Sequence, residues 1–241
     1  MIVLKKHSLG FTSLVFSSFT GPRHIHSVFE VSNGALLHLS SCSLSSSFPV
    51  SLSFANILSS GSLHVDSLLM SQFSFSRKGS VVRCSGSSAV TLTQSSFSSV
   101  SLDDGGIAVG TTTKAISITN SNFTNCSGKA FGSLIRVEIV GSSMSLVNCW
   151  FEMCSTRVCL EEREGGLASI ASRDSAGRAV LRHVLLSNCT VSNMVLAHQK
   201  GFNGGVVGWT HNPLWSDGRG MVVVGCSFGA VQLAHSSSSE L

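Results

Sequence analysis

The segment Ile118–Gly128 reads ITNSNFTNCSG, with Phe123 at its centre and polar residues on both sides. Aligning Phe123 with similar segments elsewhere in the chain produces a column of seven apolar residues. The column consists of Leu44, Met70, Phe97, Phe123, Phe151, Val191 and Phe228. A pattern that recurs at intervals of roughly 20 to 50 residues is typical of repeat proteins. We therefore interpret the segment as one copy of a structural unit.

Each unit contains two further pairs of apolar residues, and the members of a pair are two positions apart. In the unit of Phe151 these pairs are Ile135/Val137 and Met144/Leu146. Residues two positions apart lie on the same face of a β-strand. The units recur at 26, 27, 26, 28, 40 and 37 residues, measured at Leu39, Val65, Leu92, Ile118, Leu146, Leu186 and Val223. Each unit is therefore predicted to hold three short strands separated by turns.

These features predict an all-β fold, a right-handed parallel β-helix (a solenoid) of about seven three-strand coils. Each strand would pair in parallel with its equivalent in the next unit, so that equivalent side chains stack into one core. The longer last units predict loop insertions in the C-terminal third. Residues 1–26 are expected to form an N-terminal cap or degenerate coil, residues 27–231 the β-helix, and residues 232–241 a flexible Ser-rich tail.

A leucine-rich repeat is the alternative fold, because its period of roughly 20 to 29 residues also fits. That fold places a helix or similar packed element on its convex side, where these units carry Ser and Gly. A polar column supports the β-helix instead and lies between the second and third strands. It consists of Ser41, Ser67, Gln94, Asn120, Asn148, Asn188 and Gly225. Stacked amides in such a column can hydrogen-bond along the solenoid.

The composition excludes several classes of function. Of the 241 residues, 43% are hydrophobic, which is enough for a continuous core, and only 12% are charged. The net charge of +4 comes from scattered Lys and Arg without interleaved aromatic residues, so nucleic acid is not an expected partner. No apolar run reaches the ~18 residues of a membrane helix, so no transmembrane span is predicted.

Gly-Gly followed by an apolar residue occurs at Gly105-Gly106-Ile107, Gly165-Gly166-Leu167 and Gly204-Gly205-Val206. With the Phe-centred turn of each unit, this motif resembles the passenger repeats of chlamydial polymorphic outer membrane proteins and other pectate-lyase-like β-helix surface proteins. The resemblance implies a non-catalytic, adhesin-like scaffold that is extracellular or at the cell surface. The turns of that family carry Asn three residues after Phe, whereas Phe123 and Phe151 are followed by Cys126 and Cys154.

A carbohydrate-active lyase or hydrolase is the enzyme alternative, because pectate lyases and polygalacturonases share this broad architecture. Such chemistry needs clustered carboxylates on neighbouring coils. The outward positions of the Gly-flanked strand instead hold Glu30, Asn56, Arg83, Val109, Arg136, Ser169 and Gly208. We therefore predict no catalytic residue and no cofactor. A third hypothesis is a fragment of a longer repeat protein without an independent function.

The loop insertions are the predicted ligand-binding region. Loops from the same bend of neighbouring coils lie side by side and could form one patch. That patch would contain Arg173, Asp174, Arg178, His211, Trp215, Asp217 and Arg219. A Trp platform among polar groups suits a glycan or a host or surface protein as the partner. End-to-end stacking with further β-helix coils is a second expected interaction.

The eight cysteines and a histidine pair are the remaining candidates for chemistry. The spacing of the cysteines does not match a zinc site, so we interpret them as small buried hydrophobic residues. Disulfides between neighbouring coils remain an alternative. His38 and His64 fall at equivalent outward positions of adjacent coils. Because they lack a third ligand, they are expected to be solvated, and no metal site is predicted.

Overall fold

A computed structural model describes fourteen segments of the chain, and every regular element in them is a β-strand. The described segments are residues 1–16, 27–46, 49–76, 79–103, 106–111, 115–128, 133–138, 143–157, 166–171, 183–193, 195–198, 207–210, 220–230 and 232–235. Within these segments no helix is long and apolar enough to cross a membrane.

The strands form four parallel sheets that run along the molecule. The first sheet contains β1 (Ile2–Lys5), β4 (Ser27–Ser32), β7 (Ser53–Ile57), β11 (Val82–Ser85), β15 (Ala108–Thr111), β19 (Ser133–Glu138), β23 (Gly166–Ala171) and β27 (Val207–Thr210). The second contains β2 (Ser8–Thr12), β5 (Leu36–Ser40), β8 (Ser62–Asp66), β12 (Ala89–Thr93), β16 (Ala115–Thr119), β20 (Ser143–Val147), β24 (His183–Ser187) and β28 (Gly220–Val224).

The third sheet has equally many strands but shorter ones, and the fourth has six. The third contains β3 (Val15–Phe16), β6 (Ser43–Ser45), β9 (Leu69–Ser71), β13 (Ser96–Ser98), β17 (Asn122–Thr124), β21 (Trp150–Glu152), β25 (Thr190–Ser192) and β29 (Ser227–Gly229). The fourth contains β10 (Ser74–Phe75), β14 (Ser101–Leu102), β18 (Ser127–Gly128), β22 (Ser155–Arg157), β26 (Val195–His198) and β30 (Gln232–His235).

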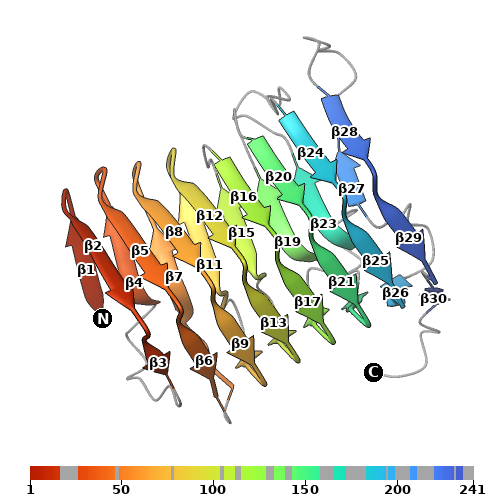
Figure 1. Cartoon of the computed structure of the whole chain (residues 1–241), viewed down its shortest axis with the longest axis horizontal. Helices are drawn as coiled ribbons and strands as arrows, with labels where there is room; N and C mark the ends of the chain where they lie inside the picture. The colour runs from red at the N-terminus through yellow and green to blue at the C-terminus, as the bar shows by residue number, and fades with distance from the viewer. Residues whose placement is uncertain are drawn as a thin grey trace.

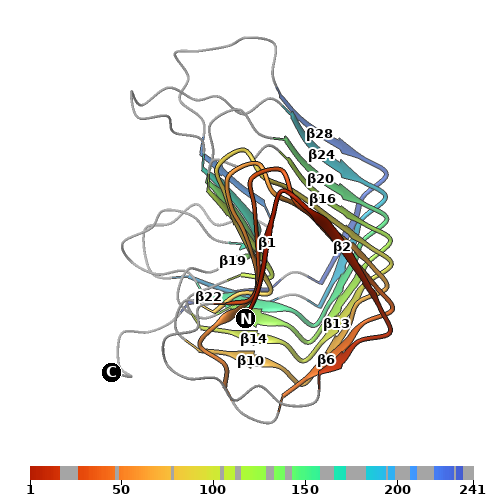
Figure 2. The same ribbon diagram turned by 90° about the vertical axis from the view of Figure 1, so that its left-hand side faces the viewer.

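The molecule is a right-handed parallel β-helix, which confirms the predicted fold. Successive coils lie side by side from the N-terminus to the C-terminus (Figure 1). Figure 2 views the molecule from the N-terminal end, and the chain turns clockwise through β1, β2 and the third sheet as it recedes. This hand agrees with the general rule for connections between parallel strands of one sheet.

The strand register matches the columns of the sequence pattern at every step. In the Phe column, Phe97 pairs with Met70 on one side and with Phe123 on the other, and Phe123 pairs with Phe151. The pairing continues through Leu44, Val191 and Phe228. A one-residue slip would turn these side chains to the outer surface, so burial of one face specifies the register.

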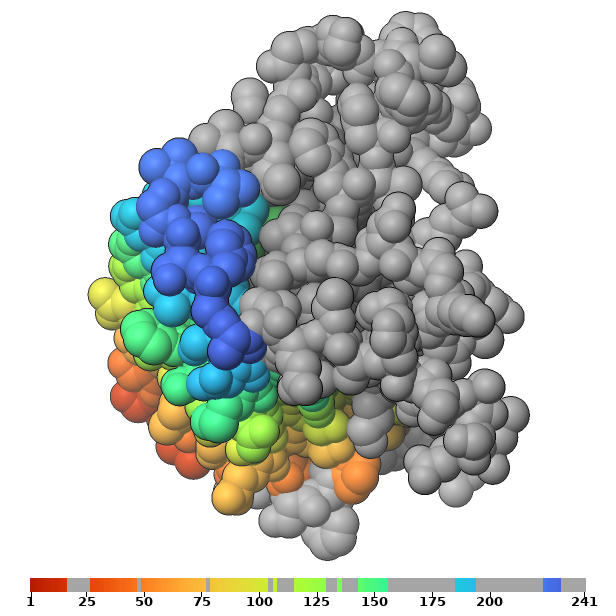
Figure 3. Space-filling model, turned by 90° about the vertical axis from the view of Figure 1, so that its right-hand side faces the viewer, coloured from red at the N-terminus to blue at the C-terminus, as the bar shows by residue number. Residues whose placement is uncertain are grey.

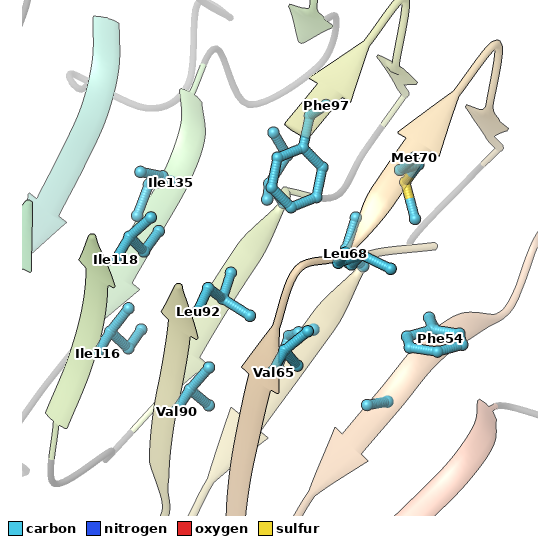
Figure 4. Packing of buried hydrophobic residues seen from close by; sticks show 14 of the residues in the cluster. Phe54, Val65, Leu68, Met70, Val90, Leu92, Phe97, Ile116, Ile118 and Ile135 are labelled. Carbon is cyan, nitrogen blue, oxygen red and sulfur yellow. The ribbon is translucent and has the colours of Figure 1, made fainter. Parts of the chain in front are cut away.

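Inward side chains of the same column stack directly on one another. The ring centroids of Phe97 and Phe123 are 5.0 Å apart with an interplanar angle of 4°, and those of Phe123 and Phe151 are 4.5 Å apart at 6°. Figure 4 shows Leu92 and Ile118 on neighbouring strands pointing into the same interior. The core is therefore a set of parallel files of apolar side chains.

At two corners of the coil, the chain turns at a single residue with left-handed backbone conformation. The first corner column is Ser13, Ser41, Ser67, Gln94, Asn120, Asn148, Asn188 and Gly225, all at φ between 49° and 63°. The second is Gln72, Ser99, Asn125, Met153, Asn193 and Ala230, at φ between 49° and 55°. Asn tolerates this region better than most residues. The predicted amide column is therefore a column of bends.

The prediction of about seven three-strand coils needs two corrections. Of the two alternatives for residues 1–26, a cap or a degenerate coil, the structure supports the coil: β1, β2 and β3 pair with the next coil and raise the number of layers to eight. From the third coil onward, each coil also has a fourth short strand. The first two of these strands bury one apolar residue each, Phe75 and Leu102. A single apolar residue gives no alternation of apolar and polar positions, so the sequence pattern did not reveal these short strands.

The predicted flexible tail at residues 232–241 is also wrong in part. Gln232–His235 form β30, which pairs with β26. Residues 236–241 lie outside the described segments.

Phe123→Ala should destabilise the protein by about 3 to 5 kcal/mol, because it opens a cavity between two stacked rings. Phe228→Ala is the matched control in the same column, since Phe228 is 48% exposed and should cost less than half as much. The free energy of unfolding from urea titrations measures both effects. Equal losses would contradict the stacked core.

Met153→Asn should stabilise the protein by roughly 0.5 kcal/mol, because Asn adopts the left-handed region at lower cost than Met. Met153 has φ of 51° and lies between Asn125 and Asn193 in its column. The opposite exchange, Asn125→Ala at φ of 52°, should destabilise. Urea midpoints of the two variants would show opposite shifts, and shifts of the same sign would contradict the corner assignment.

Candidate functional site

The outer face of the third sheet carries an exposed aromatic side chain in a polar setting. β21 alternates so that Phe151 points into the core while Trp150 and Glu152 point outward. Trp150 is 47% exposed, although large apolar side chains are usually buried. We use the name Trp150 face for the outward residues of β17, β21 and β25. They are Asn122, Thr124, Trp150, Glu152, Thr190 and Ser192.

The register places polar groups on both sides of the Trp150 indole. Trp150 pairs with Asn122 on β17 and with Thr190 on β25. Glu152 pairs in the same way with Thr124 and Ser192. Adjacent strands are ~4.8 Å apart and residues two apart along a strand are ~6.6 Å apart. Hydroxyl, amide and carboxylate groups therefore surround the indole at distances that a single small ligand could span.

The two corner columns border the Trp150 face with amides. Asn120, Asn148 and Asn188 precede β17, β21 and β25, and all three are exposed. Asn148 Nδ2 donates a hydrogen bond to Asn120 Oδ1 at 3.0 Å, which orders this border. On the other side, Asn125 Nδ2 donates to Ser99 Oγ at 3.3 Å. Each amide can donate and accept hydrogen bonds.

Sequence reasoning did not identify Trp150 as a site residue. The signal was present, because Trp150 precedes Phe151 of the inward column and must point the opposite way. The predicted loop patch lies entirely outside the described segments. This holds for Arg173, Asp174, Arg178, His211, Trp215, Asp217 and Arg219.

Carboxylates on the described outer faces are isolated from one another. Glu30 pairs with Asn56, and Glu152 pairs with Thr124 and Ser192. Asp66 pairs with Ser40 and Thr93, and its Oδ1 accepts a hydrogen bond from Thr93 Oγ1 at 2.8 Å. In the described part of the chain, no three His, Cys, Asp or Glu side chains meet in a way that could hold a metal ion.

Four of the seven described cysteines lie at the inner side of the first corner, namely Cys42, Cys149, Cys189 and Cys226. Ser95, Ser121, Cys149, Cys189 and Cys226 occupy one column, and each donates a hydrogen bond to the carbonyl oxygen two residues earlier. Ser and Cys exchange at this position because both are small and carry a donor, and Leu68 is the apolar exception in the same column. No disulfide occurs among the seven cysteines of the described segments.

Burial keeps several of these thiols protonated. Desolvation raises the pKa of the Cys84 thiol to about 12, and a hydrogen bond with Ser88 offsets part of the increase. The pKa of Cys149 is raised by its hydrogen bond with the Cys189 thiol and by burial, and that of Cys126 by its hydrogen bond with Cys154 and by burial. A protonated, buried thiol is a poor nucleophile and a poor metal ligand.

Comparison with known proteins adds no function to this geometry. No protein-family model matches the chain, and no curated protein matches its sequence. The resemblance to passenger repeats remains a prediction that rests on short motifs. A shared β-helix does not define a function.

The stability of the protein should fall as the pH rises above about 9, because an unfolded thiol ionises near ~8.5. Cys84 stays protonated up to about pH 12 in the fold, so unfolding releases a proton across this interval. Each such thiol contributes a slope of up to ~1.4 kcal/mol per pH unit. Cys84→Ser removes the group at nearly constant volume and should reduce the slope.

The measurement is the free energy of unfolding in urea between pH 8 and pH 10.5, compared as slopes. The chain contains no Tyr, so tyrosine ionisation does not contribute to the slope. An unchanged slope in Cys84→Ser would contradict this role of the buried thiol.

Proposed function

We propose that this protein is a non-catalytic, extracellular or cell-surface scaffold of adhesin type that binds a glycan on the Trp150 face. The observation that carries the proposal is the half-exposed indole of Trp150 in a flat, rigid surface of hydroxyl and amide groups. Trp is enriched at binding interfaces, because its ring offers a large apolar surface and its N–H a hydrogen-bond donor.

The indole accounts for the apolar part of recognition. The face of an aromatic ring carries negative charge density and attracts the weakly positive C–H groups on one side of a pyranose ring. Stacking on Trp150 also removes apolar surface from water. One sugar ring is about as large as the indole, so one ring would cover it.

The neighbouring side chains account for the polar part. Asn122 and Thr190 lie on the strands next to β21, and Glu152 follows Trp150 on the same face. Sugar hydroxyls both donate and accept hydrogen bonds, which matches amide and hydroxyl groups. Glu152 is the only charged residue of the Trp150 face. This charge favours neutral sugars over sulfated sugars and uronic acids.

The scaffold lowers the cost of binding. Each residue of the Trp150 face lies on a strand that is hydrogen-bonded on both sides. Groups held by regular strands lose little conformational freedom when a ligand binds. The next coil adds the polar pair Thr190 and Ser192 ~4.8 Å away.

The isolated carboxylates support the non-catalytic part of the proposal. Glycoside hydrolysis uses two carboxyl groups that flank the scissile bond. Glu152 has Thr124 and Ser192 as its cross-strand neighbours, so it has no carboxylate partner in its row. Binding without turnover is the function that this face supports best.

Trp150→Ala should reduce binding to neutral glycans by at least about tenfold, which corresponds to ~1.4 kcal/mol. A glycan array would first identify ligands of the wild-type protein, and titration calorimetry would then compare variants. Leu69→Ala is the matched control, because Leu69 is 49% exposed in the same outward column, three strands away on β9. It should bind like the wild type.

Three outcomes would contradict the proposal. Equal loss of binding in both variants would show a general surface effect. Binding of no neutral glycan at all would remove the proposed ligand class. Cleavage of polyuronides or other polysaccharides by the wild type would show that the protein is an enzyme.

A further inference from the structure

Two histidines lie directly next to each other on the outer face of the second sheet. His38 on β5 and His64 on β8 are paired Cα positions of adjacent parallel strands. Their ring centroids are 4.9 Å apart and the rings are tilted by 60°. A face-to-face stack would have nearly parallel planes, so this tilt leaves the ring nitrogens room to converge on one point.

Both side chains are accessible from solvent. β5 alternates so that Leu37 and Leu39 are buried while His38 is exposed, and His64 on β8 is half-buried. Gly10 on β2 occupies the paired position on the far side of His38 and has no side chain. An ion can therefore approach the pair from that side without displacing another residue.

The separation of the rings fits two ligands of one metal ion. A metal lies ~2.1 Å from a ligating imidazole nitrogen, which places it ~3.2 Å from the ring centroid. Two such ligands at angles between 90° and 109° would have centroids ~4.5 to ~5.2 Å apart, by this same geometry. The observed 4.9 Å lies within this interval.

We propose that His38 and His64 form a surface site for one divalent ion of the class that prefers imidazole nitrogen, namely Zn²⁺, Ni²⁺ or Cu²⁺. The two imidazoles supply both protein ligands. Water completes the coordination, since no third ligand joins the pair among the described residues. The site is on the second sheet and is independent of the Trp150 face on the third.

The surrounding charges are compatible with a cation. The outward positions of β2, β5, β8 and β12 hold one charged residue, Asp66. Asp66 lies two residues after His64 on the same face of β8, but its Oδ1 accepts a hydrogen bond from Thr93 Oγ1. Thr93 thus orients the carboxylate on the same face as the site, where its charge attracts a cation.

The rigidity of the strands strengthens the site. The two backbones are held in register by the ladder between β5 and β8. Binding therefore requires little more than rotation of two side chains, which keeps the entropic cost low. The ion would also link two neighbouring coils, so it should stabilise the folded state, by an amount that rises with the logarithm of its concentration above Kd.

Calorimetric titration of the full chain with NiCl₂, in a non-coordinating buffer near neutral pH, tests the proposal. In each of His38→Ala and His64→Ala, one fewer ion should bind per chain, or the affinity for that ion should fall by at least about tenfold, or ~1.4 kcal/mol. His7→Ala is the matched control, since His7 is also exposed and, among the described residues, lies in no histidine pair. It should bind as the wild type does.

Thermal unfolding provides a second readout, and the pair variants separate this site from other histidines, including His198 and His235, which are paired positions of β26 and β30. NiCl₂ should raise the Tm of the wild type and of His7→Ala, and should raise it less in both pair variants. Thr93→Val should tighten binding, because it frees Asp66 to become a third ligand. An unchanged number of bound ions and an unchanged Tm increase in His38→Ala and His64→Ala would overturn the proposal.

Discussion

The structure depends on in-register pairing of parallel strands, which places each residue over its equivalent in the neighbouring coil. At a strand spacing of ~4.8 Å, equivalent side chains are in van der Waals contact, so each position behaves as a column and not as a single site. Apolar columns make the core, as in the stack of Phe97, Phe123 and Phe151. Corner columns must accept a left-handed backbone, and the same pairing brings their amides together, as in the bond between Asn148 and Asn120. Core, corners and outer faces are therefore consequences of one register.

Much of this could be predicted because a column repeats the same information several times. A single Phe is ambiguous, but seven aligned apolar residues specify both a period and an inward direction. Prediction failed where a column had few informative members. For the first coil a cap and a degenerate coil stayed open as alternatives, since Leu9, Phe11 and Phe16 are embedded in Ser, Gly and Thr. The fourth strands are two to four residues long, which is too short for an alternating pattern.

The candidate site was harder to predict than the fold for a physical reason. Burial constrains inward positions to be apolar, whereas outward positions need only tolerate water and therefore vary freely. Trp150 is the only aromatic member of the described column, which is mixed: it contains Ser43, Ser96 and Asn122 but also Val15 and Leu69. The repeating pattern that reveals the core comes from many equivalent residues, so a single unusual residue does not stand out in it. The structure identifies Trp150 by its exposed area, and it identifies His38 and His64 by the distance between their rings.

The stacking of equivalent residues also explains why apolar residues are exposed on the last described coil. Val223 and Phe228 belong to columns whose inner members are buried, yet they are 45% and 48% exposed. Figure 3 views this end, with residues 223–230 in blue at the surface. A further layer with apolar residues at these two positions would extend both columns and bury their surface, at about 25 cal/mol per Å². The first coil offers that chemistry, since Phe11 and Phe16 occupy the same two columns at the other end of the solenoid. End-to-end stacking remains a prediction, but it is the interaction that the same register would extend without any new type of contact.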